Sequence, residues 1–164
     1  MEPNQSLDCG FIRNKHWFRY RVGAIIIEND CVLMASNETE DYLYSVGGAV
    51  RLGETAEEAV VREVFEETGI KYEIDRLAFI HENFFSDSGN TFKGLVCHEI
   101  AFYFLMKSRG TQEGLKCNSY SPGGKEFMNW VPISDLKNRK AYPKFFAEKL
   151  TKLPNTIEHI VTTE

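Results

Sequence analysis

The chain has 164 residues, of which 43% are hydrophobic, and its 19 basic and 24 acidic residues give a formal net charge of −5. This length and composition fit one compact domain spanning residues 1–164, with a core that needs no disulfide or structural metal. The acidic balance, without a long basic run, excludes a nucleic-acid polymer as the favoured partner, and no apolar run is long enough to cross a membrane.

The chain begins with a pattern typical of a β-hairpin. Residues 18–28 are rich in β-branched and aromatic side chains and predict a strand, residues 29–30 (Asn-Asp) predict a turn, and residues 31–36 predict the returning strand. A short basic cluster lies at the start of this segment, and we interpret it as a solvated strand face rather than a binding patch. Its members are Arg13, Lys15, Arg19 and Arg21.

A third strand and a helix follow. Residues 42–46 predict a short strand, which Gly47 and Gly48 should break. Thr55 and Glu58 form the capping-box pattern, in which each side chain bonds the backbone of the other residue. The predicted helix then continues to a left-handed stop at Gly69.

The second half of the chain predicts mainly strands. Residues 77–85 and 95–106 predict two long strands, and residues 126–131 a short one. Residues 143–153 have the apolar spacing of an amphipathic helix, and residues 157–161 predict a last strand. Long strands around two main helices predict an α/β fold, a sandwich with a mixed β-sheet.

The predicted helix carries an unusual group of acidic residues. At about 100° per residue, Glu63, Glu66 and Glu67 fall on one face, and Val64 and Phe65 should face the core on the other side. Such a face could simply be solvated. The glutamates nevertheless repel one another, by about 0.2–0.5 kcal/mol for the pair four residues apart, and two of them lie at the negative end of the helix dipole. We therefore expect Glu66→Lys to stabilise the metal-free protein, and a divalent cation to convert this repulsion into binding.

The order of residues around this helix carries a family resemblance. The segment at residues 48–70 reads Gly48-Ala49-Val50-Arg51-Leu52-Gly53-Glu54, seven further residues, and then Arg62-Glu63-Val64-Phe65-Glu66-Glu67-Thr68-Gly69-Ile70. It resembles the Nudix box at every specified position. The resemblance implies a Nudix-like α/β/α sandwich with a mixed β-sheet.

The resemblance assigns roles to the acidic residues. It implies that Glu63, Glu66 and Glu67 bind Mg²⁺, or Mn²⁺ in its place, together with the backbone carbonyl of Gly47. Arg62 matches the arginine that holds these glutamates by ion pairing. Hard oxygen ligands of this kind are those that Mg²⁺ prefers.

The loop before the helix matches the family as well. Glu54 matches the first glutamate of the box, and Gly48 and Gly53 match glycines that let the backbone approach a diphosphate. Val46 departs from the family, in which many members carry proline. This difference concerns the rigidity of the loop and removes no ligand.

The resemblance implies hydrolysis of a nucleoside diphosphate linked to another group. Bound metal would neutralise phosphate oxygens while a carboxylate accepts the proton of water. Glu67 and Glu63 are candidates for this proton acceptor, Glu126 is a candidate outside the box, and Glu99 is a second one. The alternative is a Nudix-like module that senses a nucleotide without turning it over.

Selectivity for the substrate should come from residues outside the box. Aromatic residues near predicted loop ends could stack on a base or could pack within the protein. They are Phe84, Phe85, Phe92 and Tyr120. His81 and His98 are interpreted as structural. Ser86 replaces the proline that marks ADP-ribose hydrolases of the family, so the sequence indicates a small-molecule nucleotide without specifying which.

The four cysteines, at positions 9, 31, 97 and 117, have neither CxxC nor zinc-site spacing. Thiols in a domain with an ordinary core indicate a reducing compartment, and the polar N-terminus does not resemble a signal peptide. We therefore expect a cytoplasmic protein, present as a monomer or a homodimer.

Overall fold

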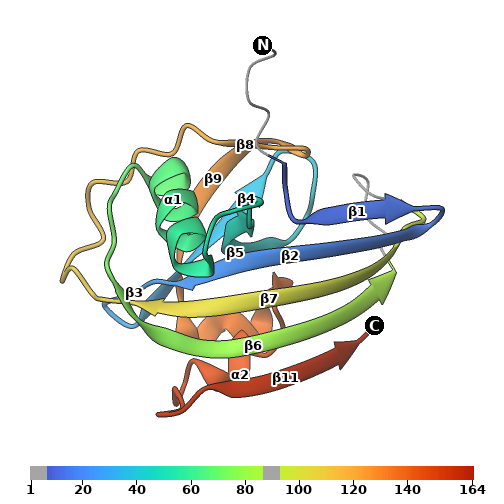
Figure 1. The fold of residues 1–164 in the computed structure, drawn as a ribbon. Helices are drawn as coiled ribbons and strands as arrows, with labels where there is room; N and C mark the ends of the chain where they lie inside the picture. Colours follow the sequence, from blue (N-terminus) through green and yellow to red (C-terminus); the bar gives the residue numbers. More distant parts are fainter. Residues whose placement is uncertain (1–6, 87–92) are drawn as a thin grey trace.

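The computed structural model describes residues 7–86 and 93–164 (Figure 1). Its strands are β1 (Gly10–Arg13), β2 (His16–Ile25), β3 (Ile27–Glu28), β4 (Cys31–Asn37), β5 (Leu43–Ala49), β6 (Ile74–Ser86), β7 (Val96–Met106), β8 (Tyr120–Ser121), β9 (Gly124–Pro132), β10 (Ala141–Tyr142) and β11 (Glu158–Thr163). Its helices are α1 (Ala56–Thr68), the 3-10 helix η1 (Ile133–Asn138) and α2 (Phe146–Lys149).

One mixed sheet organises the molecule. Its strands follow the order β11-β6-β7-β2-β5-β4-β9-β8, with β2 parallel to β7, β6 parallel to β11, and most other pairs antiparallel. One core cluster contains the buried residues of α1, and a second contains those of η1 and α2. Alternate residues of β2 enter the two clusters: Val22 and Ala24 pack with α1, and Ile25 packs with the second cluster. The predicted α/β sandwich is therefore confirmed.

Local signals predicted the turn and the ends of α1. Asn29 and Asp30 both adopt positive φ angles, of 51° and 60°, as a tight hairpin turn requires. The Thr55 side chain accepts from the backbone N–H of Glu58, and Gly69 ends the helix in the left-handed conformation at a φ of 72°. Both caps depend only on neighbouring residues, which is why the sequence predicts them.

The predicted core-facing side of α1 was wrong in part. Val64 is buried as expected and Val61 packs against the core, but Phe65 is 47% exposed, whereas Ala59, Val60 and Glu67 are buried. Glu67 lies in the middle of the buried face, because α1 packs on β5 and β2 through its small residues. The face that carries Glu63 and Glu67 is therefore the one that meets the sheet.

Two predicted boundaries also differ from the structure. Gly47 and Gly48 do not break β5: they pair with Gly23 and Val22 of β2, and the strand continues to Ala49. The predicted helix at residues 143–153 is reduced to the four residues of α2. Most turns there close through bonds between residues three apart, such as the 3.2 Å bond from the N–H of Ala147 to the carbonyl of Lys144, so a regular α-helix does not form.

A buried carboxylate anchors the loop that follows β7. Glu28 is 1% exposed, and its carboxylate accepts hydrogen bonds from the Ser108 hydroxyl at 2.7 Å and from the backbone N–H groups of Arg109 and Gly110 at 2.6 and 2.9 Å. The Gln112 amide donates to the backbone carbonyl of Glu28 at 3.1 Å. This one acidic side chain thus satisfies several donors of a loop that has no regular structure.

We expect Glu28→Ala to lower the free energy of unfolding by about 3 kcal/mol, because it leaves buried donors without an acceptor. Urea denaturation measures this change. The control is Glu73→Ala, which removes an exposed carboxylate that pairs with Lys107 at 2.9 Å and should cost less than about 0.5 kcal/mol. Similar small losses for both variants would contradict the anchoring role.

Candidate active site

Two glutamates of α1 are enclosed between the helix and β5. The backbone N–H of Gly47 donates to Oε1 of Glu67 at 3.1 Å. A Cβ atom added to Gly48 would lie 2.6 Å from the carboxyl carbon of Glu63, closer than atoms can approach. A side chain at position 48 would therefore displace the Glu63 carboxylate from its present position beside the strand.

Glu67 is a buried carboxylate with incomplete hydrogen bonding. It is 4% exposed, and its Oε2 atom has no hydrogen-bond partner within the described residues. Burial raises the pKa of Glu67 well above its usual range, and the nearby charges of Glu126 and Glu63 raise it further. The charge of Arg21 partly offsets these effects, but within the described residues Glu67 forms no direct ion pair of the kind that a buried charge requires.

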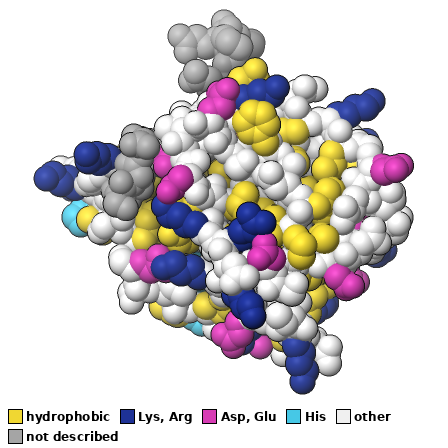
Figure 2. Space-filling view, turned by 180° about the vertical axis from the view of Figure 1, so that it is seen from behind, with side chains coloured by type: hydrophobic (Ala, Val, Ile, Leu, Met, Phe, Trp, Pro, Cys, Tyr) yellow, Lys and Arg dark blue, Asp and Glu magenta, His cyan; other side chains and the backbone are white. Residues whose placement is uncertain are grey.

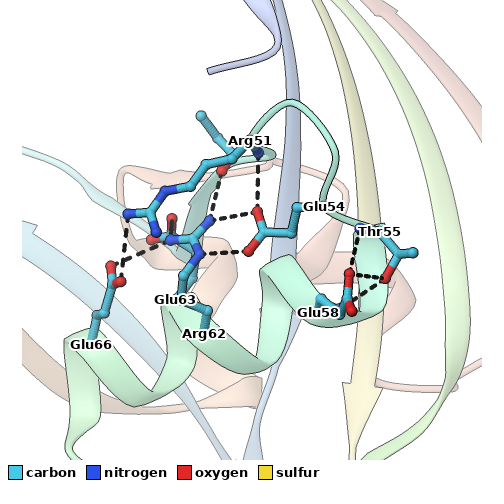
Figure 3. Close-up of polar contacts among 8 residues, drawn as sticks. Arg51, Glu54, Thr55, Glu58, Arg62, Glu63 and Glu66 are labelled. Carbon is cyan, nitrogen blue, oxygen red and sulfur yellow. Dashed lines mark hydrogen bonds and ion pairs between the residues drawn. The ribbon is translucent and has the colours of Figure 1, made fainter. Parts of the chain in front are cut away.

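Arg62 connects the other acids of α1 and its preceding loop (Figure 3). It donates to both carboxylate oxygens of Glu54, at 2.7 and 3.0 Å, and to Glu63 at 2.5 Å. Longer contacts of 3.4 and 3.1 Å reach Glu66 and the carbonyl of Ala49. The contacts with Glu63 and Glu66 are among those expected for Arg62, whereas within the described residues it forms no ion pair with Glu67. Its pair with Glu54 was not predicted, and it joins the loop to the helix.

Glu66 is placed differently from Glu63 and Glu67. Its side chain is 45% exposed and lies between two arginines, 3.6 Å from Arg51 and 3.4 Å from Arg62 (Figure 3). These ion pairs offset the repulsion that the sequence analysis assigned to this position. The expected gain from Glu66→Lys therefore loses its basis, because a lysine would face both arginines.

Tertiary structure brings Glu126 of β9 to the same place. Glu126 is 6% exposed, and it lies close enough to Glu67 for its charge to raise the pKa of that residue. The Tyr44 hydroxyl donates to its Oε2 at 2.5 Å, and the Ser119 hydroxyl donates to its Oε1 at 2.9 Å. Neither Tyr44 nor Ser119 was anticipated, because no spacing in the sequence links them to Glu126.

The second outside candidate, Glu99, belongs to a buried polar group on β2, β6 and β7. It forms an ion pair with Arg19, and although burial alone would raise the pKa of Glu99, Arg19 and Arg21 hold it below the usual value. Arg21 also donates to the Ser45 hydroxyl at 3.4 Å, and its Nε atom is buried. The interpretation of Arg19 and Arg21 as a solvated face was therefore wrong.

Two of the aromatic candidates for base stacking, Phe84 and Phe85, lie apart from the glutamates. The Phe84 ring stacks on His98 with the ring centroids 4.3 Å apart, and the strand register aligns both residues with Phe18 of β2. Gly47, beside α1, aligns instead with Gly23, about 16 Å farther along β2. The structure thus does not bring Phe84 or its neighbour Phe85 to the carboxylates. Tyr120 is 75% exposed, and Phe92 lies outside the described residues.

The carboxylates of this site differ in how readily they could bind a divalent cation. Within residues 7–86 and 93–164, no three acidic, histidine or cysteine side chains are grouped so as to enclose an ion, and Glu63 and Glu66 are paired with Arg62. Glu67 and Glu126, by contrast, receive hydrogen bonds only from neutral groups, and neither forms an ion pair in the part of the chain that the structure describes. Unpartnered Oε2 of Glu67 and these hard oxygen donors suit Mg²⁺.

One face of the molecule is drawn in Figure 2. On this face, basic side chains are interspersed with acidic and hydrophobic ones. Among the described residues, no helix has both the length and the apolar composition needed to cross a bilayer.

Comparisons with known proteins find a family model and relatives that match most of this chain or a part of it. The family model for the NUDIX domain matches residues 17–151. A MutT-like protein of Streptomyces ambofaciens is 29% identical over 121 residues, which are 73% of this chain and 68% of that protein. A putative mutator protein MutT4 of Mycobacterium tuberculosis is 34% identical over 99 residues, and the match covers 58% of this chain but only 34% of that protein. A mutator MutT protein of Bacillus halodurans shares the fold, with a TM-score of 0.64 at 22% identity over 88% of this chain and 90% of that chain.

The stability of the fold should depend on pH through the buried side chain of His81. Burial lowers the pKa of His81, an effect that Glu99 partly offsets, and its Nδ1 atom has no hydrogen-bond partner in the described chain. Because the folded protein disfavours the charged imidazole, stability should be complete above the unfolded pKa of about 6.5 and should fall as the pH decreases below it. Urea denaturation between pH 7.5 and 5 should show a weaker pH dependence in His81→Gln. The exposed control His16→Gln should keep the dependence of the wild type, and equal dependences in all three proteins would contradict the assignment.

A second prediction concerns the charge of Glu67. Glu67→Gln keeps an acceptor for the N–H of Gly47 but removes the charge. At pH 8 without metal, the free energy of unfolding of this variant should therefore be higher than that of the wild type. Mg²⁺ at ten times its Kd should stabilise the wild type by about 1.4 kcal/mol and leave Glu67→Gln unchanged. Urea denaturation with MgCl₂ or with EDTA measures both effects. Equal stabilisation of both proteins by Mg²⁺ would place the ion elsewhere.

Proposed function

Since the chain belongs to the Nudix family, we propose that it is a metal-dependent hydrolase that cleaves the diphosphate linkage of a nucleoside diphosphate linked to another group. The observation that carries this proposal is the buried pair Glu67 and Glu126, which receives only neutral hydrogen bonds beside an otherwise arginine-paired acidic cluster. Such an uncompensated pair is costly in a structural role and useful in binding a cation. The expected cytoplasmic location and the monomeric or homodimeric state remain predictions.

The residues that would hold the cation are Glu63, Glu66 and Glu67, with the carbonyl of Gly47. A bound Mg²⁺ or Mn²⁺ supplies positive charge for the diphosphate oxygens and acidifies water. Glu67 is already fixed by the N–H of Gly47, whereas Glu63 and Glu66 must exchange part of their contact with Arg62 for the ion. We propose that Glu54 retains Arg62 through its two bonds during this exchange.

The loop glycines favour binding of the substrate. Gly48 lies in direct contact with Glu63, and Gly53 adopts a φ of 85° that few other residues tolerate. We propose that the backbone from Gly48 to Gly53 lies against the diphosphate and brings it to the carboxylates. Phe84 and Phe85 lie too far along the sheet to contact the same group, so a role for them requires an extended substrate.

We assign proton transfer to Glu126 in preference to the other acids. Glu67 and Glu63 are proposed as ligands of the cation, and Glu99 is occupied by its ion pair with Arg19. Glu126 is buried and fixed, and each of its oxygens receives one hydrogen bond. A carboxylate has about four acceptor positions, so lone pairs remain to take a proton from the attacking water.

The test is a screen of nucleoside triphosphates, nucleotide sugars, ADP-ribose and dinucleotides with Mg²⁺ and with Mn²⁺, followed by variants on the best substrate. We expect Glu67→Gln and Glu126→Gln to lower kcat by about 10²-fold or more, because one removes a cation ligand and the other the proton acceptor. Glu57→Gln, an exposed change on the same helix, is the matched control and should retain full activity.

The result of this screen distinguishes a hydrolase from a module that senses a nucleotide without turning it over. The sensor module remains the second candidate, and it predicts tight binding of a nucleotide without turnover under any metal. Isothermal titration with the same nucleotides therefore accompanies the screen. Binding without release of phosphate or of a nucleoside monophosphate would reject the hydrolase in favour of the sensor.

A further inference from the structure

We propose that Tyr44 and Ser119 are positioning residues that together hold the carboxylate of Glu126 in the orientation required for proton transfer. This inference rests on the proposed function, and it extends the site to two side chains outside the Nudix box. The two residues come from different parts of the fold: Tyr44 from β5, and Ser119 from the loop before β8.

The geometry of the two hydrogen bonds fixes the carboxylate plane. Tyr44 donates to Oε2 at 2.5 Å and Ser119 donates to Oε1 at 2.9 Å, so each oxygen of Glu126 has its own donor. A single donor would allow the carboxylate to rotate about its terminal bond, which has a broad torsional preference. Two donors on opposite oxygens remove that freedom without adding a charge.

Glu126 needs such a restraint because of its neighbour. The charges of Glu126 and Glu67 are close enough to affect each other, and both side chains are buried. Like charges repel more strongly in a poorly solvated site than in water. Without its two donors, the Glu126 carboxylate would gain by turning away from Glu67, and the proton acceptor would leave the reaction site.

Tyr44 is itself held as a donor. The amide of Asn37 donates to the Tyr44 oxygen at 3.5 Å, so the hydroxyl hydrogen is directed to Glu126. Burial and the hydrogen bond to Glu126 raise the pKa of Tyr44, which keeps the phenol protonated. Three residues farther along β5, Gly47 bonds Glu67, so one strand positions both carboxylates.

Ser119 is held by hydrogen bonds of its own segment to β9 and to the end of α1. The backbone N–H of Glu126 donates to the carbonyl of Ser119 at 3.1 Å, and the Cys117 thiol donates to the carbonyl of Glu126 at 3.3 Å. The N–H of Lys116 donates to the carbonyl of Thr68 at the end of α1, at 2.8 Å. The Ser119 hydroxyl is thereby placed relative to both Glu126 and the helix that carries Glu67.

The test measures kcat and KM for Tyr44→Phe, Ser119→Ala and the double variant on the substrate found in the screen. We expect each single change to lower kcat about tenfold with KM changed less than about twofold, because substrate binding does not use Glu126. Ser119→Thr retains a hydroxyl and should keep kcat within about threefold. Tyr142 is aligned with Tyr44 on the neighbouring strand β10 but is not one of the two donors to Glu126, so Tyr142→Phe is the matched control for loss of a phenol and should behave as the wild type.

A double-mutant cycle distinguishes positioning from general stability. In the Glu126→Gln background, Tyr44→Phe and Ser119→Ala should lower kcat no further, because the group that they position is already removed. A crystal structure of the variant that combines Tyr44→Phe and Ser119→Ala, with Glu126 retained, should show the Glu126 carboxylate rotated from its wild-type position. This readout requires no activity.

Three results decide the proposal. If Tyr44→Phe and Ser119→Ala keep full kcat while Glu126→Gln is inactive, positioning is rejected and the proposed function stands. Further losses of kcat in the Glu126→Gln background would reject positioning in favour of a structural role. If the wild type turns over none of the nucleotides, the proposed hydrolase fails, and an unmoved Glu126 in the double variant would then reject positioning as well.

Discussion

The close packing of α1 on the glycines of β5 is the constraint on which the rest of this structure depends. Gly48 leaves no space for a side chain beside Glu63, and the N–H of Gly47 reaches Glu67 directly. Two acidic side chains are thereby enclosed between a helix and a sheet, a position that soluble proteins usually reserve for apolar residues. The small residues Ala56 and Ala59 share this face of the helix and make the approach possible.

The acids around α1 divide into two sets by the kind of group that donates hydrogen bonds to them. Glu54, Glu63 and Glu66, which form the outer set, pair with Arg62. Glu67 and Glu126 are deeper and receive hydrogen bonds only from a backbone N–H and from hydroxyl groups. This division leaves the negative charge concentrated where a cation could approach the two deeper carboxylates, while the arginine keeps the outer acids ordered.

Rigidity around the deeper pair comes from segments that are distant along the chain. The buried carboxylate of Glu28 anchors one end of the loop after β7, and the backbone of Glu126 binds the other end. Between them, Lys116 bonds the end of α1 at Thr68. A site held in this way keeps like charges close together, and the stability that this arrangement costs is recovered in the surrounding hydrogen bonds and in the core.

The sequence by itself determined α1 with both of its caps, the hairpin turn at Asn29 and Asp30, the approximate positions of the main strands along the chain and the pairing of Arg62 with Glu63, because these depend on residues close together in the chain. Only the tertiary structure decided which face of α1 is buried, and it placed Phe65 outside and Glu67 inside. It also decided that β5 continues through Gly47 and that Tyr44, Ser119 and Glu126 meet. These features arise from pairing between strands far apart in sequence and from the fit of a helix against a sheet, which periodicity and local propensity do not encode.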